Sequence, residues 1–251
     1  MNDWAVHLTV VIPAFDEVAR IGPTLEQVRR YLQEQSFDSE VVVVVDGGRD
    51  GTLALVRAAT TDWPTLRVLD NGANRGKGYS VRRGMLTARG RYLLFSDADL
   101  STPIAEVERL ITALEAGADI AIGSRALAGS DVRVRQSWWR QSMGRIFNHI
   151  VQLVAVPGIR DTQCGFKCFR RDVARRIFAR QRTTRFSFDV ELLWIARKLD
   201  YRVVEVPVTW VNDPSSRVHP VSDSLRMLVD LARLRYDDLR GAYRTRDDHA
   251  S

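Results

Sequence analysis

The residues best suited to chemistry are two aspartates, Asp97 and Asp99, which follow an apolar segment with strand character at 91–96. Side chains two residues apart on an extended chain point to the same side, so both carboxylates converge if the chain stays extended across Ala98. Convergent carboxylates repel each other unless a cation or a proton lies between them. Such hard oxygen ligands suit Mg²⁺ or Mn²⁺ carrying a substrate's phosphates. The alternative is a polar turn that closes a strand.

Further polar clusters follow other segments with strand character, and helical segments alternate with these strands. This alternation predicts an α/β protein with a mostly parallel, doubly wound sheet and helices on both faces. Ligands bind outside the carboxyl ends of the strands in such sheets, so polar clusters there favour a functional site over simple turns. The predicted strands are 8–13, 41–45, 66–69, 91–96 and 119–123. The polar groups past their ends are Glu17, Asp46, the loop 76–78, Asp97 and Asp99.

Composition bounds the class of protein. The 251 residues suffice for one large α/β domain or two small ones, and the 45% hydrophobic content is ordinary for a globular core. The net charge of +6 suggests an anionic partner. Cys164 and Cys168 do not make a disulfide framework and indicate reduced thiols in a cytoplasmic protein. The first residues lack the features of a signal peptide, and no apolar run approaches the roughly 20 residues that span a bilayer.

Two segments of the C-terminal half combine apolar and basic residues. Trp138 and Trp139 lead an amphipathic stretch through 154, which fits either a helix in a membrane interface or a core helix with an arginine-rich outer face. A long helix predicted at about 222–243 is a second candidate membrane-surface element, with an apolar stripe of Leu225, Leu228, Leu231 and Leu234. We therefore expect a catalytic domain at 1–215, with 216–251 as a C-terminal amphipathic helix and tail.

Taken together, these motifs resemble family 2 glycosyltransferases of the GT-A fold, and within them the dolichyl- or polyprenyl-phosphate β-glucosyltransferase branch. The resemblance covers roughly residues 8–212. Asn-Arg-Gly-Lys-Gly at 74–78 and Arg-Asp-Thr-Gln-Cys-Gly-Phe-Lys at 160–167 are its most specific parts and point to the glucosyl branch. The other matching segments are 11–17, 46–52, 97–99, 123–125 and 188–193.

The resemblance implies a role for each candidate site residue. Asp46 would accept a hydrogen bond from uracil, Lys77 would lie near the nucleotide, and Asp97 would approach the ribose or the sugar. Asp99 would hold the metal that bridges the diphosphate, with Asp97 beside it. The residues implied to line the nucleotide pocket are Pro13, Ala14 and Glu17. Those implied for the acceptor phosphate are Arg125 and Arg135, and those for the sugar are Gln163 and Asp189.

The implied reaction is inverting transfer of glucose from UDP-glucose to a polyprenyl phosphate, assisted by Mg²⁺ or Mn²⁺. The protein would act at the cytoplasmic membrane surface, through peripheral contact by amphipathic basic helices and without nucleic acid as a partner. Two residues depart from the family pattern of two acids followed by Gly-Ser: Val45 replaces the first acid and Gly48 the serine. This chain also lacks the membrane-spanning segment that members of the family often carry.

Two other functions remain open from the residues. A transferase acting on a soluble acceptor hydroxyl would need a general base, for which Asp189 is the best candidate. A binding protein, either a transferase-like scaffold with weakened catalysis or a basic nucleic-acid binder, finds its best support in the Val45 departure. A nucleotide kinase is disfavoured because the glycine loop at 72–78 lacks the spacing and the final Ser or Thr of a P-loop.

Overall fold

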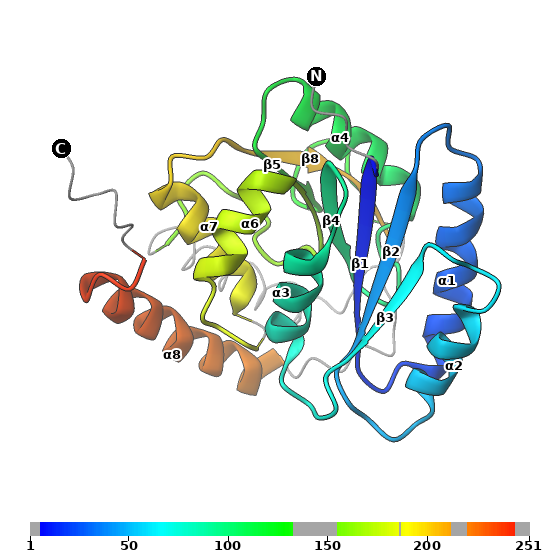
Figure 1. Cartoon of the computed structure of the whole chain (residues 1–251). Coiled ribbons are helices and arrows are strands. Elements are labelled where there is room, and N and C mark those ends of the chain that lie inside the picture. Colours follow the sequence, from blue (N-terminus) through cyan, green and yellow to red (C-terminus); the bar gives the residue numbers. More distant parts are fainter. Residues whose placement is uncertain (1–5, 133–154, 186, 212–219, 244–251) are drawn as a thin grey trace.

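The computed structural model describes residues 6–132, 155–185, 187–211 and 220–243 (Figure 1). Its strands form a seven-stranded sheet in the order β3-β2-β1-β4-β7-β5-β8, and a small sheet pairs β6 with β9. The strands are β1 (Leu8–Ala14), β2 (Ser39–Val45), β3 (Leu66–Asp70), β4 (Tyr92–Ser96), β5 (Ile120–Ser124), β6 (Asp131–Val132), β7 (Phe166–Arg170), β8 (Val203–Pro207) and β9 (Thr209–Trp210). The helices are α1 (Val18–Gln33), α2 (Thr52–Ala59), α3 (Lys77–Thr87), the short 3-10 helix η1 (Ile104–Glu106), α4 (Val107–Glu115), α6 (Arg171–Arg180), α7 (Phe188–Lys198) and α8 (Pro220–Leu239).

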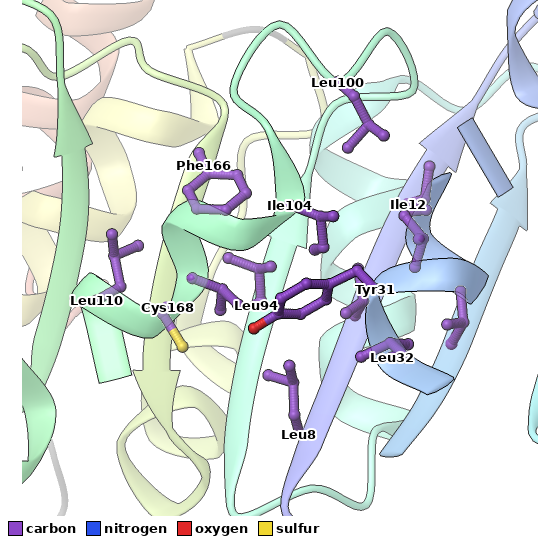
Figure 2. Close-up of a cluster of buried hydrophobic side chains, with 14 of the residues drawn as sticks. Leu8, Ile12, Tyr31, Leu32, Leu94, Leu100, Ile104, Leu110, Phe166 and Cys168 are labelled. Atoms are coloured by element: carbon purple, nitrogen blue, oxygen red, sulfur yellow. The ribbon is translucent and has the colours of Figure 1, made fainter. Parts of the chain in front are cut away.

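The sheet divides the core into two apolar layers because successive side chains of a strand point to opposite faces. In β2, Val41, Val43 and Val45 join the layer under α1, α2 and α4, whereas Val42 and Val44 join the layer under α3, α6, α7 and α8. Figure 2 shows the first layer, where side chains from the sheet meet those from α1 and the η1–α4 segment. The predicted doubly wound arrangement with helices on both faces is confirmed.

The strand β7 was not predicted. It lies between β4 and β5 and runs antiparallel to both, whereas the other pairings in the large sheet are parallel. The strand begins at Phe166 and carries Lys167 with no exposed surface. The strand β8, which ends at Pro207, is an edge of the sheet.

The C-terminal helix α8 packs against α7 with the side that carries Leu231 and Leu234, which are 6% and 5% exposed. The Arg235 guanidinium lies 4.7 Å from the ring centre of Trp194 on α7. These two leucines, expected on a membrane-facing stripe, therefore face the core instead. The side chains of Leu225 and Leu228, and the whole stretch 138–154, lie outside the described residues.

Among the described helices, none is long and apolar enough to cross a bilayer. Cys164 and Cys168 are both free thiols, as the sequence predicted, and both are buried.

Candidate active site

A cavity of about 920 Å³ opens where the loops after β1, β2 and β3 meet. This is the carboxyl edge of the sheet, where ligands bind in open α/β folds, and the volume suits a small-molecule site. The cavity is lined by Phe15, Asp16, Val18, Ala19, Gly48, Arg49, Asp50, Gly72, Ala73 and Asn74. The family resemblance implied that Pro13, Ala14, Glu17 and Asp46 contact the nucleotide, but none of these four residues lines this cavity.

The contacts of Pro13, Ala14 and Glu17 within the protein explain why these residues do not line the cavity. Pro13 and Ala14 are buried in β1, where they pair with Val44 and Val45 of β2. Glu17 directly precedes α1, and both of its carboxylate oxygens bind the Arg20 guanidinium, at 2.5 and 2.9 Å. Their contact with a nucleotide therefore stays a prediction.

Gly48 shapes the cavity wall. Its φ of +104° is a backbone conformation that residues with a side chain rarely adopt, and an added Cβ would come within 2.5 Å of Asp16 Oδ1. The Arg49 amide donates to the same oxygen at 3.3 Å. A serine at position 48 is therefore incompatible with this arrangement of the loop unless Asp16 moves.

The loop after β2 is tied to α1 and α2 by Asp50. Its carboxylate accepts hydrogen bonds from the Val18 amide at 2.9 Å and from the Thr52 amide and hydroxyl at 3.0 and 2.6 Å. Although burial acts to raise it, the pKa of Asp50 is lowered because these hydrogen bonds favour the carboxylate. The Thr52 hydroxyl in turn accepts from the Glu17 amide at 2.9 Å, which joins the first two loops.

Asp46 holds the third loop in place. This carboxylate, on a residue that is 3% exposed, accepts from the Asn71 side-chain amide at 2.6 Å and from the backbone amides of Arg75 and Gly76 at 3.0 and 2.8 Å. Three donors occupy most of the acceptor capacity of a carboxylate. Contact with uracil remains a prediction, whereas the bonds to the glycine loop are present in the structure.

The charge of Asp97 acts on Asp99, although the chain between them is not extended. The backbone turns at Ala98, and the Leu100 amide donates to the Asp97 carbonyl at 3.2 Å. The condition set for convergence, an extended chain across Ala98, is not met, because a reverse turn follows β4. The two carboxylates are nevertheless close enough for the charge of Asp97 to act on Asp99.

Lys77 binds Asp97 across the site, with its Nζ 2.7 Å from Asp97 Oδ1. The Asp97 carboxylate also lies over Gly165, where an added Cβ would come within 2.1 Å of Oδ2. Only glycine, which has no Cβ, leaves room at position 165 for the Asp97 carboxylate. The sequence placed Lys77 near the nucleotide but gave no sign of this ion pair.

The electrostatics of the cluster are unusual. The pKa of Asp99 is raised, first by burial and then by the charge of Asp97. Burial acts to lower the pKa of Lys77, but the charges of Asp97 and Asp189 outweigh it, and that pKa is raised. The cluster thus combines a Lys77 ammonium whose positive charge is stabilised by carboxylates with an Asp99 carboxylate whose negative charge is not fully balanced.

These residues fit a divalent cation. A cation at Asp99 would relieve the repulsion that raises its pKa, and carboxylate oxygens are the ligands that Mg²⁺ and Mn²⁺ prefer. Within the described part of the chain, no group of three or more His, Cys, Asp or Glu side chains could hold a metal. Substrate phosphates and water would therefore complete the coordination, as is common for Mg²⁺.

Asp189 lies beneath the cluster and is 3% exposed. The Lys167 ammonium donates to its carboxylate and, at 2.7 Å, to the Cys164 carbonyl. Burial raises the pKa of Asp189, and the charges of Lys167 and Lys77 only partly oppose this. Asp189 is thus the counterion of a buried lysine, an arrangement that its sequence neighbours did not reveal.

Arg125 follows β5 and forms a two-bond ion pair with Asp161, through its Nε at 2.7 Å and its Nη2 at 2.8 Å. The charge of Asp97 also acts on this guanidinium, which places Arg125 at the edge of the same cluster. An acceptor phosphate would have to bind the other edge of the guanidinium. Gln163, two residues past Asp161, has a buried side-chain Nε2 without a hydrogen-bond partner among the described residues. Arg135 lies outside the described residues.

The rim thus carries a nucleotide-sized cavity beside a lysine–carboxylate cluster, on a fold found in solved glycosyltransferases. The glucosyl-3-phosphoglycerate synthase of Mycobacterium tuberculosis, solved with Mn²⁺, uridine diphosphate and glucosyl-3-phosphoglycerate, superposes with a TM-score of 0.65 at 16% identity, covering 91% of this chain and 78% of that one. Mannosyl-3-phosphoglycerate synthase from Rubrobacter xylanophilus superposes with a TM-score of 0.66 at 16% identity, covering 96% and 76%. The protein therefore has the GT-A glycosyltransferase fold.

The sequence comparisons narrow the class to one family. The model for glycosyl transferase family 2 matches residues 9–178. A dolichyl-phosphate beta-glucosyltransferase of Drosophila melanogaster is 40% identical, covering 96% of this chain and 78% of its own length. Another of that name, from Dictyostelium discoideum, is 37% identical, covering 95% and 77%. The chain belongs to glycosyl transferase family 2.

Proposed function

We propose that this enzyme transfers glucose from UDP-glucose to a dolichyl-type polyprenyl phosphate, with inversion at the sugar. The observation that carries the proposal is the Lys77–Asp97–Asp99 cluster beside the cavity, in a chain whose curated relatives are named for glucosyl transfer to dolichyl phosphate. The nucleoside would occupy the cavity formed by the first three loops. The diphosphate would then extend toward Asp99.

In this reaction an oxygen of the acceptor phosphate forms a bond to the anomeric carbon, and the bond from that carbon to UDP breaks. UDP departs with the electron pair. Bound at Asp99, Mg²⁺ or Mn²⁺ would neutralise charge on the leaving diphosphate. The Lys77 ammonium, held by Asp97, supplies a second positive charge near the same oxygens, and the cluster positions donor and acceptor in line.

The environment of Asp189 supports a phosphate as the acceptor. A phosphate is already ionised near neutral pH and needs no general base, whereas an acceptor hydroxyl does. Asp189 is buried and bound by the Lys167 ammonium. It lacks the free, solvent-facing carboxylate that a base for a bulky acceptor requires. In this proposal its charge fixes Lys167 and acts on Lys77, and Gln163 offers its amide to the sugar.

We also propose that the protein works at the cytoplasmic membrane surface through peripheral contact. The outer side of α8 exposes Val229, Tyr236 and Leu239, which are 65%, 57% and 83% exposed and fall on one helical stripe. Arg233 and Arg240 are exposed on the same stripe. Apolar and basic side chains together suit the surface of an anionic bilayer. Loss of vesicle binding in a Val229→Asp, Leu239→Asp double variant would support this contact, and unchanged binding would contradict it.

The transfer proposal is tested with labelled UDP-glucose and a short polyprenyl phosphate in the presence of Mg²⁺ or Mn²⁺. Product is followed into the organic phase, with parallel reactions from UDP-galactose, UDP-N-acetylglucosamine and GDP-mannose. Label entering the lipid from UDP-glucose alone is the expected result. Metal-dependent release of UDP without a lipid product would move the search to a soluble acceptor, and no turnover would favour a binding protein.

A further inference from the structure

We propose that Glu191 and Tyr243 form a latch that positions Lys77 in the active site and makes the end of the C-terminal helix part of the catalytic apparatus. The latch comprises Glu191 on α7, Tyr243 just after α8, and the segment 181–184 between α6 and α7. Neither Glu191 nor Tyr243 is among the sequence-predicted site residues. Their effect would be exerted through the backbone on either side of Lys77.

The first step is the carboxylate of Glu191, a residue that has no exposed surface. Its Oε1 accepts hydrogen bonds from the Arg182 amide at 2.9 Å and from the Tyr243 hydroxyl at 2.7 Å, and its Oε2 accepts from the Thr183 amide at 2.8 Å. Hydrogen bonds to a charged group are stronger than neutral ones. Glu191 therefore fixes the backbone of 182–183 and the phenol of Tyr243 together.

The second step joins that backbone to the first turn of α3. The Tyr79 amide donates to the Thr184 carbonyl at 3.1 Å, and the Gln181 side chain donates to the Gly78 carbonyl at 2.9 Å. An added Cβ at Gly76 would come within 2.3 Å of the Thr184 carbonyl oxygen, and one at Gly78 within 2.8 Å of the Thr183 carbonyl oxygen. The glycines on either side of Lys77 are thus required by the close approach of this segment.

The third step is Lys77 itself, whose backbone lies between these two glycines and whose Nζ binds Asp97 at 2.7 Å. A lysine side chain has many rotamers, so its ammonium stays at one place only if the backbone beneath it is fixed. The segment 181–184 provides that support from behind the site. Loss of a latch contact should therefore release Lys77 from Asp97 before it disturbs the core.

The position of Tyr243 follows from the way α8 ends. Gly241 has a φ of +76°, and the Ala242 amide donates to the Asp237 carbonyl at 3.0 Å, which is a common way of ending a helix with glycine. This turn brings Tyr243 back toward α7, where it is 4% exposed. At the other side of the contact, the Ser187 hydroxyl donates to Asp230 of α8 at 2.5 Å. Two hydrogen bonds therefore hold α8 and the residues after it against α7 and Ser187: Tyr243 to Glu191, and Ser187 to Asp230.

The test uses the lysines of the chain, which are Lys77, Lys167 and Lys198. Their acetylation by N-hydroxysuccinimide acetate is measured by mass spectrometry on the 251-residue chain, as wild type and as Tyr243→Phe. Lys167 has no exposed surface and reports loss of the fold, whereas the Lys198 side chain is 47% exposed and reports surface reactivity. Tyr236→Phe is the matched control, since it removes the same hydroxyl from an exposed position on α8.

We expect Tyr243→Phe to raise the acetylation rate of Lys77 by roughly tenfold, the factor that corresponds to loss of one hydrogen bond to a charged group. Lys167 and Lys198 should react as in the wild type, and Tyr236→Phe should change none of the rates. Glu191→Gln, which replaces an acceptor oxygen by a donor, should have the same effect on Lys77. An unchanged Lys77 rate, or a parallel rise at Lys167, would overturn the proposal.

A second test measures the kinetics of Tyr243→Phe, and it depends on the proposed transfer activity. Tyr243→Phe should lower kcat while leaving the KM for the acceptor unchanged, because the latch acts on Lys77 and not on acceptor contacts. The acetylation experiment needs no turnover, so absence of transfer in the wild type would reject the proposed function and leave the latch to be judged by Lys77 alone.

Discussion

Replacing Lys167 by methionine tests the buried ion pair beneath the active site. The substitution keeps an unbranched side chain of similar length but removes the ammonium, which binds Asp189 and the Cys164 carbonyl. Both Lys167 and Asp189 are buried, at 0% and 3% exposure. The single variant leaves a buried carboxylate without its partner.

The expected loss is large. Breaking a buried ion pair by removing one member costs about 3–5 kcal/mol, a large part of the roughly 5–15 kcal/mol that stabilises a typical domain. Adding Asp189→Leu removes the second charge, so the main penalty disappears and the remaining loss is about 1–2 kcal/mol, chiefly the unpaired Cys164 carbonyl and imperfect packing. The double variant should therefore be more stable than the single one.

Urea unfolding followed by circular dichroism measures both variants. A double variant as unstable as Lys167→Met would show that the two charges are not coupled and would refute this account of the site. The folded double variant also tests catalysis, because we expect it to retain transfer within about tenfold of the wild type. A general base contributes about 10²–10⁴-fold, so a loss of that size would restore Asp189 as a base and favour the acceptor with a hydroxyl.

Three further predictions concern the rest of the rim. Asp99→Asn should keep the fold, as judged by circular dichroism, but lower metal-dependent turnover by at least about a hundredfold, since it removes the carboxylate proposed for the metal; full activity would contradict that role. Gly76→Ala should lower the free energy of unfolding by about 2–4 kcal/mol, because its φ of +99° and the Thr184 carbonyl leave no room for a Cβ; an unchanged melting temperature would count against the close approach. The pKa of Asp161 is lowered, because Arg125 outweighs the effect of burial. Its contribution to stability is therefore fully present above the ordinary aspartate pKa of about 4 and lost as the pH falls through the lowered value, and urea titrations of Asp161→Asn should lack this acid-side slope.

Local pattern was sufficient to predict the parallel strands β1 to β5 and the edge of the sheet where their carboxyl ends lie, but not the antiparallel strand β7. Uniformly apolar runs such as 41–45 indicate strands covered on both faces, and they are confirmed as buried. The polar residues after each strand then fall on one rim because parallel strands share their carboxyl edge. Lys77, Asp97 and Asp99 were placed together by this reasoning, and the structure brings them together.

The pairings within the site could not be predicted in this way, because they join residues far apart in the chain. Lys167 looks like part of a polar loop until Asp189, on another element, makes its burial possible. Asp46 resembles an exposed ligand until the donors of the loop 71–76 surround it. Which residue pairs with a buried charge depends on the folded structure. The spacing of apolar residues along the chain does not predict it.

The structure shows what surrounds the two positions that depart from the family pattern. Val45 is 1% exposed and joins the apolar layer under α1 and α2, so the position lies inside the sheet and not in the cavity lining. Gly48 leaves space that the Asp16 carboxylate fills, 2.5 Å from where a serine Cβ would stand. An oxygen therefore still faces this part of the cavity, although it comes from the loop after β1. Asp46, the acid of the pattern that this chain keeps, holds the glycine loop that leads to Lys77.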